Sequence, residues 1–339
     1  MSIRVSDPFN AAADPALPTL AAALNPEVAR HEFKRRLPRL SGAGRLRLRE
    51  IRVVRHKPGK RCVVEYDVEV QQPDAREETV TLIGKVRARR SGNEGFRQLE
   101  TIWNAGFAAD SADGICVPEP IGVISEFNMW FQRKVPGRTA TALLTGAGGV
   151  ALARQIAAAA HKLHHANLPT ERTHTMADEL RILRECLAKV AALKSDWSAR
   201  LEGLTNAAEK LGASFVPARI CGIHRDFYPA QVIVDGPRLC LIDFDLFCAG
   251  DPGLDPGNFI GHMIESSLRE AGDANASAIA AEALENRFVE LSGEATRASV
   301  RAYTTLTLVR HVYLSTQFAD RARTTEALLE LCERRLAGE

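Results

Sequence analysis

The segment GIHRDFYPAQVIVDGPRLCLIDFDLFCAGDPGLDPGN occupies residues 222–258 and carries the strongest pattern in the chain. Two short apolar runs, residues 232–234 and 239–242, contain β-branched side chains typical of strands. Between them, the Asp-Gly-Pro-Arg sequence at 235–238 is a strong turn signal. The segment therefore predicts a β-hairpin that is entered and left by loops.

The predicted turn sets the register of this hairpin, with Val234 opposite Leu239. Gln231 and Asp243 then lie near each other at the open end, and Asp226 lies in the loop that leads into it. Two carboxylates and a carboxamide oxygen would meet at one point. Such a set could bind Mg²⁺ and leave one carboxylate to act as a base.

Three short motifs occur in this segment: H-x-D-x-x-x-x-Q at 224–231, I-D-F-D at 242–245 and G-D-P-x-x-D at 250–255. Together they resemble the aminoglycoside phosphotransferase/choline kinase-like family, whose usual pattern is H-G-D-x-x-x-x-N followed by I-D-x-x. The resemblance implies an α+β, bilobal protein-kinase-like fold, with a small antiparallel-sheet N-lobe and a mostly helical C-lobe. Two residues depart from the pattern, because Arg225 replaces Gly and Gln231 replaces Asn.

The resemblance also implies a role for each motif residue. Asp226 is expected to be the catalytic base, and His224 to support its loop through hydrogen bonds. Gln231 and Asp243 are expected to hold Mg²⁺ beneath ATP. Asp255 is expected to brace the catalytic loop through the loop's backbone.

The chain is expected to have three parts. Residues 1–44 would form an N-terminal helical extension that ends at a glycine-rich break, and residues 1–14 of it are expected to be disordered. Residues 45–134 would form the N-lobe, an ATP-binding sheet plus one helix. Residues 135–339 would form the helical C-lobe, with the catalytic hairpin at 222–245.

The N-lobe begins with strands separated by a basic hairpin tip that contains Lys57 and Arg61. In the family this loop lies over the ATP phosphates, although a solvated basic loop fits the sequence equally well. In the third strand, alternation places Ile83 and Lys85 on one face. The resemblance implies that Lys85 holds the α- and β-phosphates, and the alternative is an edge-strand lysine that points to solvent.

A helix is predicted over residues 92–105. In the family, a glutamate on this helix pairs with the strand lysine. Glu94 and Glu100 both qualify, and Glu94 matches the family position better. Two segments, 117–124 and 129–137, complete the N-lobe. The second is a strand that resembles the hinge, where backbone groups of Arg133 to Val135 would bind the adenine edge.

The second half of the chain has helical periodicity. Helices are predicted at 17–24 and 26–37 in the extension, and at 149–166, 176–195, 198–211, 256–271, 276–291, 294–318 and 321–336 after the hinge. Three histidines, His161, His164 and His165, have the spacing of metal ligands on a helix. A structural or surface role is favoured, because no carboxylate or cysteine accompanies them. Asp251, Asn258, His262 and Glu265 are named, from proximity alone, as candidates for the acceptor site.

Composition limits the class of protein. The chain has 339 residues, 45% apolar and 25% charged, which is typical of soluble globular proteins. Its net charge of +2 argues against a nucleic-acid-binding protein. No apolar run is long enough for a membrane span, and no signal sequence is evident. Seven scattered cysteines without a C-x-x-C motif indicate neither a disulfide framework nor a zinc site, so a cytoplasmic location is expected.

We therefore expect an ATP- and Mg²⁺-dependent kinase that acts on a hydroxyl of a small molecule, as a monomer or homodimer, without nucleic-acid or membrane partners. A protein kinase is disfavoured, because only about a dozen residues separate Asp243 from Asp255 and leave no room for an activation segment. The alternative is a nucleotide-binding module of the same fold with little or no phosphotransferase activity. The reason for this alternative is Gln231, whose side chain is longer than that of the usual Asn and would hold a metal less firmly.

Overall fold

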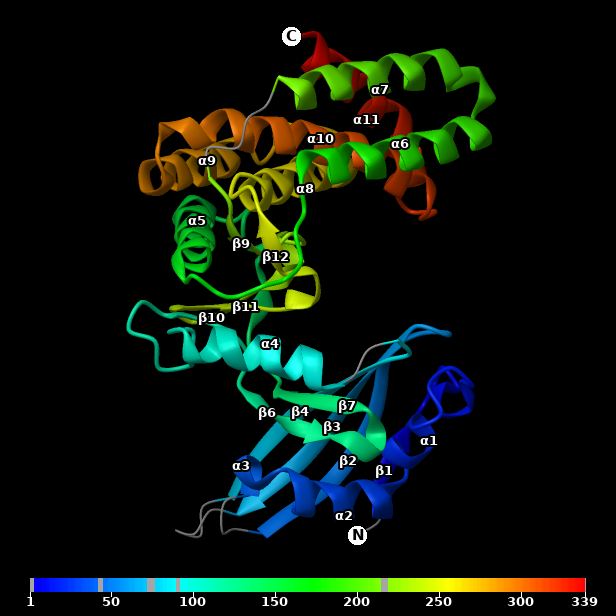
Figure 1. Cartoon of the computed structure of the whole chain (residues 1–339), viewed down its shortest axis with the longest axis vertical. Helices are drawn as coiled ribbons and strands as arrows, with labels where there is room; N and C mark the ends of the chain where they lie inside the picture. The colour runs from blue at the N-terminus through cyan, green and yellow to red at the C-terminus, as the bar shows by residue number, and fades with distance from the viewer. Residues whose placement is uncertain (1–2, 42–44, 72–76, 90–91, 215–218, 339) are drawn as a thin grey trace. The chain divides into compact units, whose positions relative to one another are not determined.

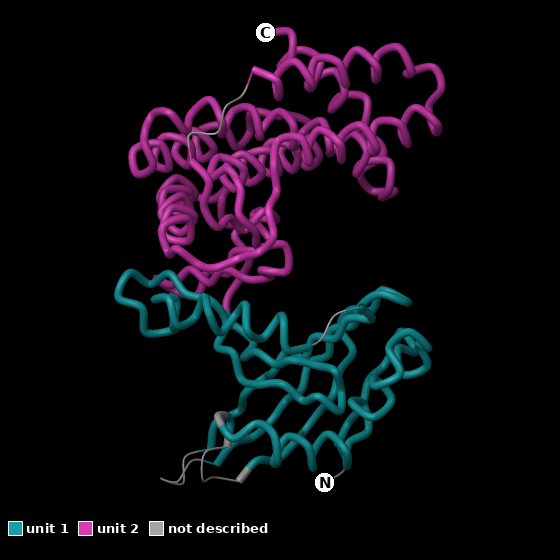
Figure 2. The backbone as a smooth tube through the Cα atoms, in the orientation of Figure 1, with its two compact units in different colours: residues 1–136 teal, residues 137–339 magenta. Residues whose placement is uncertain are grey.

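The computed structural model describes residues 3–41, 45–71, 77–89, 92–214 and 219–338. It divides into two compact units, Met1–Pro136 and Gly137–Glu339 (Figure 2). The first unit is rich in strands and the second is mostly helical (Figure 1). The glycine-rich break predicted at the end of the N-terminal extension falls on residues 42–44, which lie outside the described residues.

The described residues of the first unit form a six-stranded sheet in the order β1-β2-β3-β4-β7-β6. Its strands are β1 (Arg4–Ser6), β2 (Arg45–Lys57), β3 (Arg61–Gln71), β4 (Glu77–Arg87), β6 (Pro120–Ile124) and β7 (Met129–Arg133). Strand β1 pairs parallel with β2, and the other pairs are antiparallel. Helix α4 (Gly92–Asn104) follows β4, and the short strand β5 (Ile115–Cys116) precedes β6.

The two faces of this sheet differ in burial because side chains alternate along each strand. In β4, Val80, Leu82 and Val86 are buried, whereas Ile83 and Lys85 lie on the opposite, half-buried face. The prediction that Ile83 and Lys85 share a face is confirmed.

The N-terminal extension covers the buried face. It contains α1 (Leu20–Ala23), α2 (Pro26–Arg36) and α3 (Pro38–Ser41), and α2 lies along the sheet in Figure 1. From α2, the Phe33 ring packs 5.0 Å from Tyr66 and 5.2 Å from Phe131, both on sheet strands. The two helices predicted here are confirmed, although the first is shorter than expected. The extension therefore supplies part of the hydrophobic core of the first unit.

The prediction of disorder in residues 1–14 is wrong for the part that the structure describes. Strand β1 extends the sheet, and Asp14 anchors the segment to the loop between β2 and β3. The Asp14 carboxylate accepts a hydrogen bond from the Gly59 N–H at 2.8 Å. The Nε2 atom of His56 lies 2.8 Å from the same carboxylate. The bond from Gly59 and that from His56 hold the pKa of Asp14 below its ordinary value.

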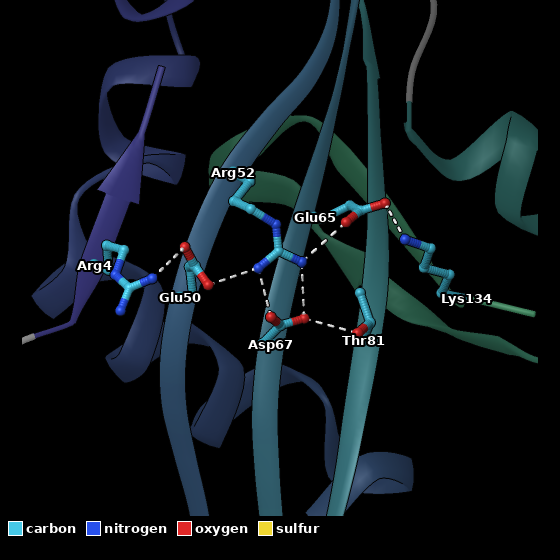
Figure 3. A network of polar contacts seen from close by, with 7 residues as sticks. All are labelled: Arg4, Glu50, Arg52, Glu65, Asp67, Thr81 and Lys134. Carbon is cyan, nitrogen blue, oxygen red and sulfur yellow. Dashed lines mark hydrogen bonds and ion pairs between the residues drawn. The ribbon is translucent and has the colours of Figure 1, made fainter. Parts of the chain in front are cut away.

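A network of charged side chains crosses β2, β3 and β4 on the half-buried face (Figure 3). Arg52 donates to both oxygens of Asp67, at 2.5 and 3.1 Å, and to Glu65 at 2.9 Å. Thr81 also donates to Asp67, and Lys134 donates to Glu65 at 2.6 Å. Burial alone would raise the pKa of Asp67, but the hydrogen bonds from Arg52 and Thr81 outweigh it and lower the pKa. Arg52 therefore ties two strands together through charge-assisted bonds.

We expect Arg52→Ala to lower the free energy of unfolding by about 2 kcal/mol, because the buried Glu65 and the half-buried Asp67 lose their shared partner. Arg4→Ala is the matched control, since the Arg4 side chain is 80% exposed and lies 3.6 Å from Glu50. Its effect should stay below about 0.5 kcal/mol. Urea titrations followed by circular dichroism measure both, and equal losses would contradict the importance of the network.

The second unit consists mainly of long helices, with short strands that pair in the orders β11-β10-β8 and β12-β9 (Figure 1). Its helices are α5 (Gly149–His165), α6 (Met176–Leu193), α7 (Ser198–Ala213), α8 (Leu254–Ala271), α9 (Ala278–Ser292), α10 (Arg297–Thr316) and α11 (Thr325–Ala337). Its strands are β8 (Arg138–Thr139), β9 (Cys221–Ile223), β10 (Val232–Asp235), β11 (Arg238–Leu241) and β12 (Cys248–Gly250). All the helices predicted for this half are present, with ends that differ by a few residues. Helix α11 begins at Thr325 rather than 321, because residues 322–324 form a 3-10 turn.

Helices α8 and α10 form the centre of this unit and approach each other closely. A Cβ atom added at Gly257 would lie 2.7 Å from the Val300 carbonyl oxygen, and one at Gly261 would lie 2.6 Å from Thr307 Cγ2. Glycines one turn apart on α8 therefore let α10 pack directly against its backbone. This contact fixes α8, which carries Asp255 at its start.

Candidate active site

The β10–β11 hairpin has the predicted register, with Val234 opposite Leu239. Beyond the strands, the Ile242 N–H donates to the Gln231 carbonyl oxygen at 3.0 Å. This bond closes the open end of the hairpin and brings the backbones of Gln231 and Asp243 close together.

The loop that carries Asp226 is held by one buried carboxylate. Asp255, fully buried at the start of α8, accepts the Arg225 N–H at 2.7 Å and the His224 N–H at 2.8 Å. The His164 ring on α5 lies 2.8 Å from the same carboxylate. The prediction that Asp255 braces the loop through its backbone is confirmed. The structural role favoured for the helical histidines is confirmed for His164.

His224 is itself buried and bonded to the hairpin. Its Nε2 lies 2.9 Å from the Ile242 carbonyl oxygen, and its ring packs against Phe227 and Phe244. These contacts link the start of the loop to the end of β11. They agree with the expected role of His224, which is to support the loop through hydrogen bonds.

Arg225 and Asp243 both have left-handed backbone conformations, with φ of 69° and 66°. A side chain in this region costs roughly 1–2 kcal/mol relative to an ordinary conformation. At position 225 the usual pattern has Gly, which has no such cost. The bond from the Arg225 N–H to Asp255 helps hold this conformation with an arginine present.

The structure brings the side chains of Asp226 and Gln231 together. The Gln231 amide nitrogen lies 3.5 Å from Asp226 Oδ2 and 3.3 Å from the Tyr228 hydroxyl, and Gln231 is only 6% exposed. The carboxamide of Gln231 also carries an oxygen, which is a ligand type that binds Mg²⁺. Asp243 lies just after the end of β11, the strand paired with β10, and its side chain is half-buried. The donor set fits Mg²⁺, which binds proteins through one or two carboxylates and completes its shell with phosphate and water.

Within the described ranges, no three His, Cys, Asp or Glu side chains converge as a metal site. A cation at this loop would therefore depend on the Gln231 oxygen together with Asp243.

In the first unit, the Lys85 ammonium lies over the Trp130 ring, 5.0 Å from its centroid. Trp130 also contacts α4, because a Cβ atom added at Gly95 would lie 2.5 Å from the indole nitrogen. The indole thus places α4 beside the strand of Lys85. On this helix Glu94 is exposed and Glu100 is half-buried, and which of them pairs with Lys85 stays a prediction.

The basic loop and the predicted hinge residues also belong to the first unit. Lys57 and Arg61 face each other across the β2–β3 hairpin. At the predicted hinge, the Arg133 N–H donates to the Glu119 carbonyl oxygen and the Lys134 N–H to the Thr81 carbonyl oxygen. The sheet thus already uses these two donors. No backbone bond from the Val135 N–H is found within the described part of the chain.

A family model described as the phosphotransferase enzyme family (APH) matches residues 100–303. The chain belongs to this phosphotransferase family. The family prediction is confirmed, and so is the prediction of a phosphotransferase. A comparison with curated proteins gives no match.

Solved structures show the fold of this phosphotransferase. A choline/ethanolamine kinase family protein from Mesorhizobium loti is 15% identical with a TM-score of 0.55, over 93% of this chain and 92% of the other. A spectinomycin phosphotransferase in complex with ADP and spectinomycin is 12% identical with a TM-score of 0.57, over 91% and 92%. A thermostable mutant of the aminoglycoside phosphotransferase APH(4)-Ia is 17% identical with a TM-score of 0.58, over 86% and 96%. The predicted α+β, protein-kinase-like fold is confirmed.

Several residues that support the loop carrying Asp226 were not predicted to do so. Asn258 on α8 donates to the Phe227 carbonyl oxygen at 2.8 Å and accepts from Arg310 on α10 at 2.5 Å. Arg310 also lies 3.6 Å from Glu179 on α6, which is bonded to His174 at 2.6 Å. Asn258 therefore fixes the residue directly after Asp226, and Arg310 fixes Asn258.

Glu179 lies at the end of this chain of contacts and is 5% exposed. Burial would raise its pKa, but the hydrogen bond with His174 and the charges of Arg310 and Arg225 lower it overall. Glu179 therefore stays ionised and offsets the positive groups behind the loop. In the sequence it is one acidic residue on an amphipathic helix, and no pattern distinguishes it.

The candidates for the acceptor site are mostly used within the protein. Asp251 accepts from Ser299 and the Gly253 N–H, Asn258 donates to the Phe227 carbonyl oxygen, and Arg269 donates to Glu265 at 3.1 Å. His262 is half-buried and stacks on Tyr228, with ring centroids 4.6 Å apart. Of the four, His262 is the one that is not fully buried, and it contacts Tyr228 in the loop that follows Asp226.

We expect Asp255→Asn to lower the free energy of unfolding by about 2 kcal/mol. The carboxylate accepts from the His224 N–H, the Arg225 N–H and the His164 ring, whereas the amide of Asn would turn its own N–H₂ group toward one of these donors. Asp235→Asn, in the hairpin turn, is the matched control and should have little effect, since its contact with Arg238 is exposed. Urea denaturation measures both variants. An unchanged Asp255→Asn protein would show that the carboxylate does not hold the loop.

Proposed function

We propose that this phosphotransferase transfers the γ-phosphoryl group of ATP to a hydroxyl of a small molecule. One observation carries the proposal: Asp255 holds the His224 and Arg225 backbone so that Asp226 lies beside the Gln231 amide. Nucleotide-bound relatives of the same fold support it. They include the spectinomycin phosphotransferase solved with ADP and an amicoumacin kinase solved with AMP-PNP and Ca²⁺, the latter 13% identical with a TM-score of 0.55, over 84% of this chain and 88% of the other.

In this proposal Asp226 accepts a hydrogen bond from the acceptor hydroxyl and takes its proton as the phosphoryl group moves. His224 keeps the loop in place through its bonds to Asp255 and Ile242. The side-chain oxygens of Gln231 and Asp243 would hold Mg²⁺. When bound, the ion would neutralise charge on the phosphates.

The first unit would bind the rest of the nucleotide. Lys85, paired with Glu94, would orient the α- and β-phosphates, and Lys57 and Arg61 would lie over them. Backbone groups from Arg133 to Val135 would bind the adenine edge. Of these, the Val135 N–H is the best-supported donor, because the N–H groups of residues 133 and 134 already bond within the sheet.

The acceptor is proposed to be a small hydroxylated molecule. The described residues include no helix long and apolar enough to cross a membrane. A cytoplasmic location and a monomeric or homodimeric state are part of the same proposal. The rival function, a nucleotide-binding module without transfer, is favoured by one observation, the longer Gln231 side chain at the position of a metal ligand.

Asp226→Asn is expected to lower turnover by a factor of about 10²–10⁴ while largely sparing ATP affinity, because the base is lost and the loop geometry is kept. Phosphorylated product is measured by mass spectrometry across a panel of hydroxylated metabolites, and ATP affinity by calorimetry. Asp235→Asn serves as the control with full activity. Wild-type protein that binds ATP but yields no phosphorylated product from any acceptor would favour the rival function.

The Gln231 side chain offers a sharper test of the metal assignment. Gln231→Asn restores the usual family residue and should keep Mg²⁺-dependent binding of AMP-PNP. Gln231→Leu and Asp243→Ala should each weaken that binding about tenfold or more, because each removes an oxygen ligand. Calorimetry with and without Mg²⁺ separates the metal-dependent part. Equal Mg²⁺ dependence in all four proteins would remove Gln231 and Asp243 from the metal site.

A further inference from the structure

The helical unit contains a second feature that the proposed reaction does not use. A cavity of about 920 Å³ lies between α7, α9, α10 and α11. Its lining combines apolar side chains, such as Leu211 and Leu336, with the basic residues Lys210, Arg301 and Arg335. The volume lies in the range of small-molecule sites. None of the residues assigned above to catalysis or to nucleotide binding lines it.

The acidic charge in this lining is already offset. Glu285 is the acidic residue of the cavity wall, and it forms ion pairs with Arg301 at 2.8 Å and with Arg297 at 3.1 Å. In the part of the chain that the structure describes, neither Lys210 nor Arg335 has a carboxylate within ion-pair distance. The cavity wall therefore carries an excess of positive charge.

Arg335 is the most informative of these cations because it is half-buried. Its contact is a long hydrogen bond from Nε to the Thr305 hydroxyl, at 3.4 Å, and burial lowers the pKa of its guanidinium. Arg200 on α7 shows the usual arrangement, with two bonds to Glu333 at 2.8 and 2.6 Å. The charge of Glu285, which is shared with Arg297 and Arg301, raises the pKa of Arg335 but by less than burial lowers it. Removing a guanidinium from water without a direct ion pair is unfavourable, and an anion in the cavity would offset that cost.

Helix dipoles are the simpler explanation for basic residues at these positions. Lys210 and Arg335 both lie in the last turn of their helices, where cations stabilise the C-terminal end. Arg334 lies in the same last turn of α11, however, and is exposed. Arg334 can therefore stabilise the C-terminal end of α11 from the surface. The helix dipole does not explain why Arg335 lines the cavity.

We propose that this cavity binds a small organic phosphate, a molecule with a dianionic group and an apolar body. The Arg335 guanidinium, with Lys210 and Arg301, would hold the phosphate oxygens through charge-assisted bonds. Leu211 and Leu336 would contact the apolar body. The site does not depend on the proposed kinase activity.

Phenyl phosphate is the probe, and phenol is the neutral control. Calorimetry is run on the full chain with Mg²⁺ and AMP-PNP present, so that the nucleotide site is filled. We expect one phenyl phosphate to bind per chain. Arg335→Gln and Lys210→Gln should each raise its Kd about tenfold or more, whereas Arg334→Gln, which shares the helix turn, should leave the Kd unchanged.

Three results would overturn the proposal: wild-type protein that does not bind phenyl phosphate at millimolar concentration, phenol that binds equally well, or Arg335→Gln and Lys210→Gln variants that bind like wild type. Circular dichroism checks that each variant is folded. Lys210 is exposed, so Lys210→Gln should fold normally. This variant tests the proposal even if Arg335→Gln is unstable.

Discussion

The carboxylate of Asp255 is the constraint on which the candidate site depends. It is fully buried and accepts hydrogen bonds from two successive backbone N–H groups, those of His224 and Arg225. A loop held in this way cannot rotate Asp226 away without leaving buried donors unpaired, which is costly in a packed interior. The bond from the Arg225 N–H also helps hold the left-handed conformation of this residue. Helix α8 keeps Asp255 in place because its glycines pack directly against α10.

Two further contacts make this arrangement rigid from both sides. On one side, His224 reaches the Ile242 carbonyl and so joins the loop to the hairpin that carries Asp243. On the other, Asn258 and Arg310 hold the Phe227 carbonyl against α8 and α10. Asp226 thus lies between two fixed points. Preorganised positioning of this kind is the main contribution that a phosphotransferase can make, because phosphoryl transfer needs little covalent help from the protein.

The β10–β11 hairpin was predictable because its information is local. A turn between two apolar runs determines the register, and the motif spacing places Asp226, Gln231 and Asp243 in one loop cluster. Helices were predictable from periodicity, with errors at their ends. The order of residues 3–14 was not predictable, since it depends on Asp14 meeting the Gly59 N–H more than forty residues away. Glu179, Arg310 and the Arg52 network depend in the same way on tertiary contacts, which leave no pattern in the sequence.

The most direct test of the central claim uses Mn²⁺ in place of Mg²⁺, with AMP-PNP, and measures paramagnetic broadening of assigned NMR signals. The account predicts that the side-chain amide of Gln231 and the backbone signals of residues 226 and 243 broaden first, and only when the nucleotide is present. Asp255→Asn should spread this broadening, because the loop is no longer held in one position. Broadening that spares residues 226, 231 and 243, in either the presence or absence of nucleotide, would contradict the account.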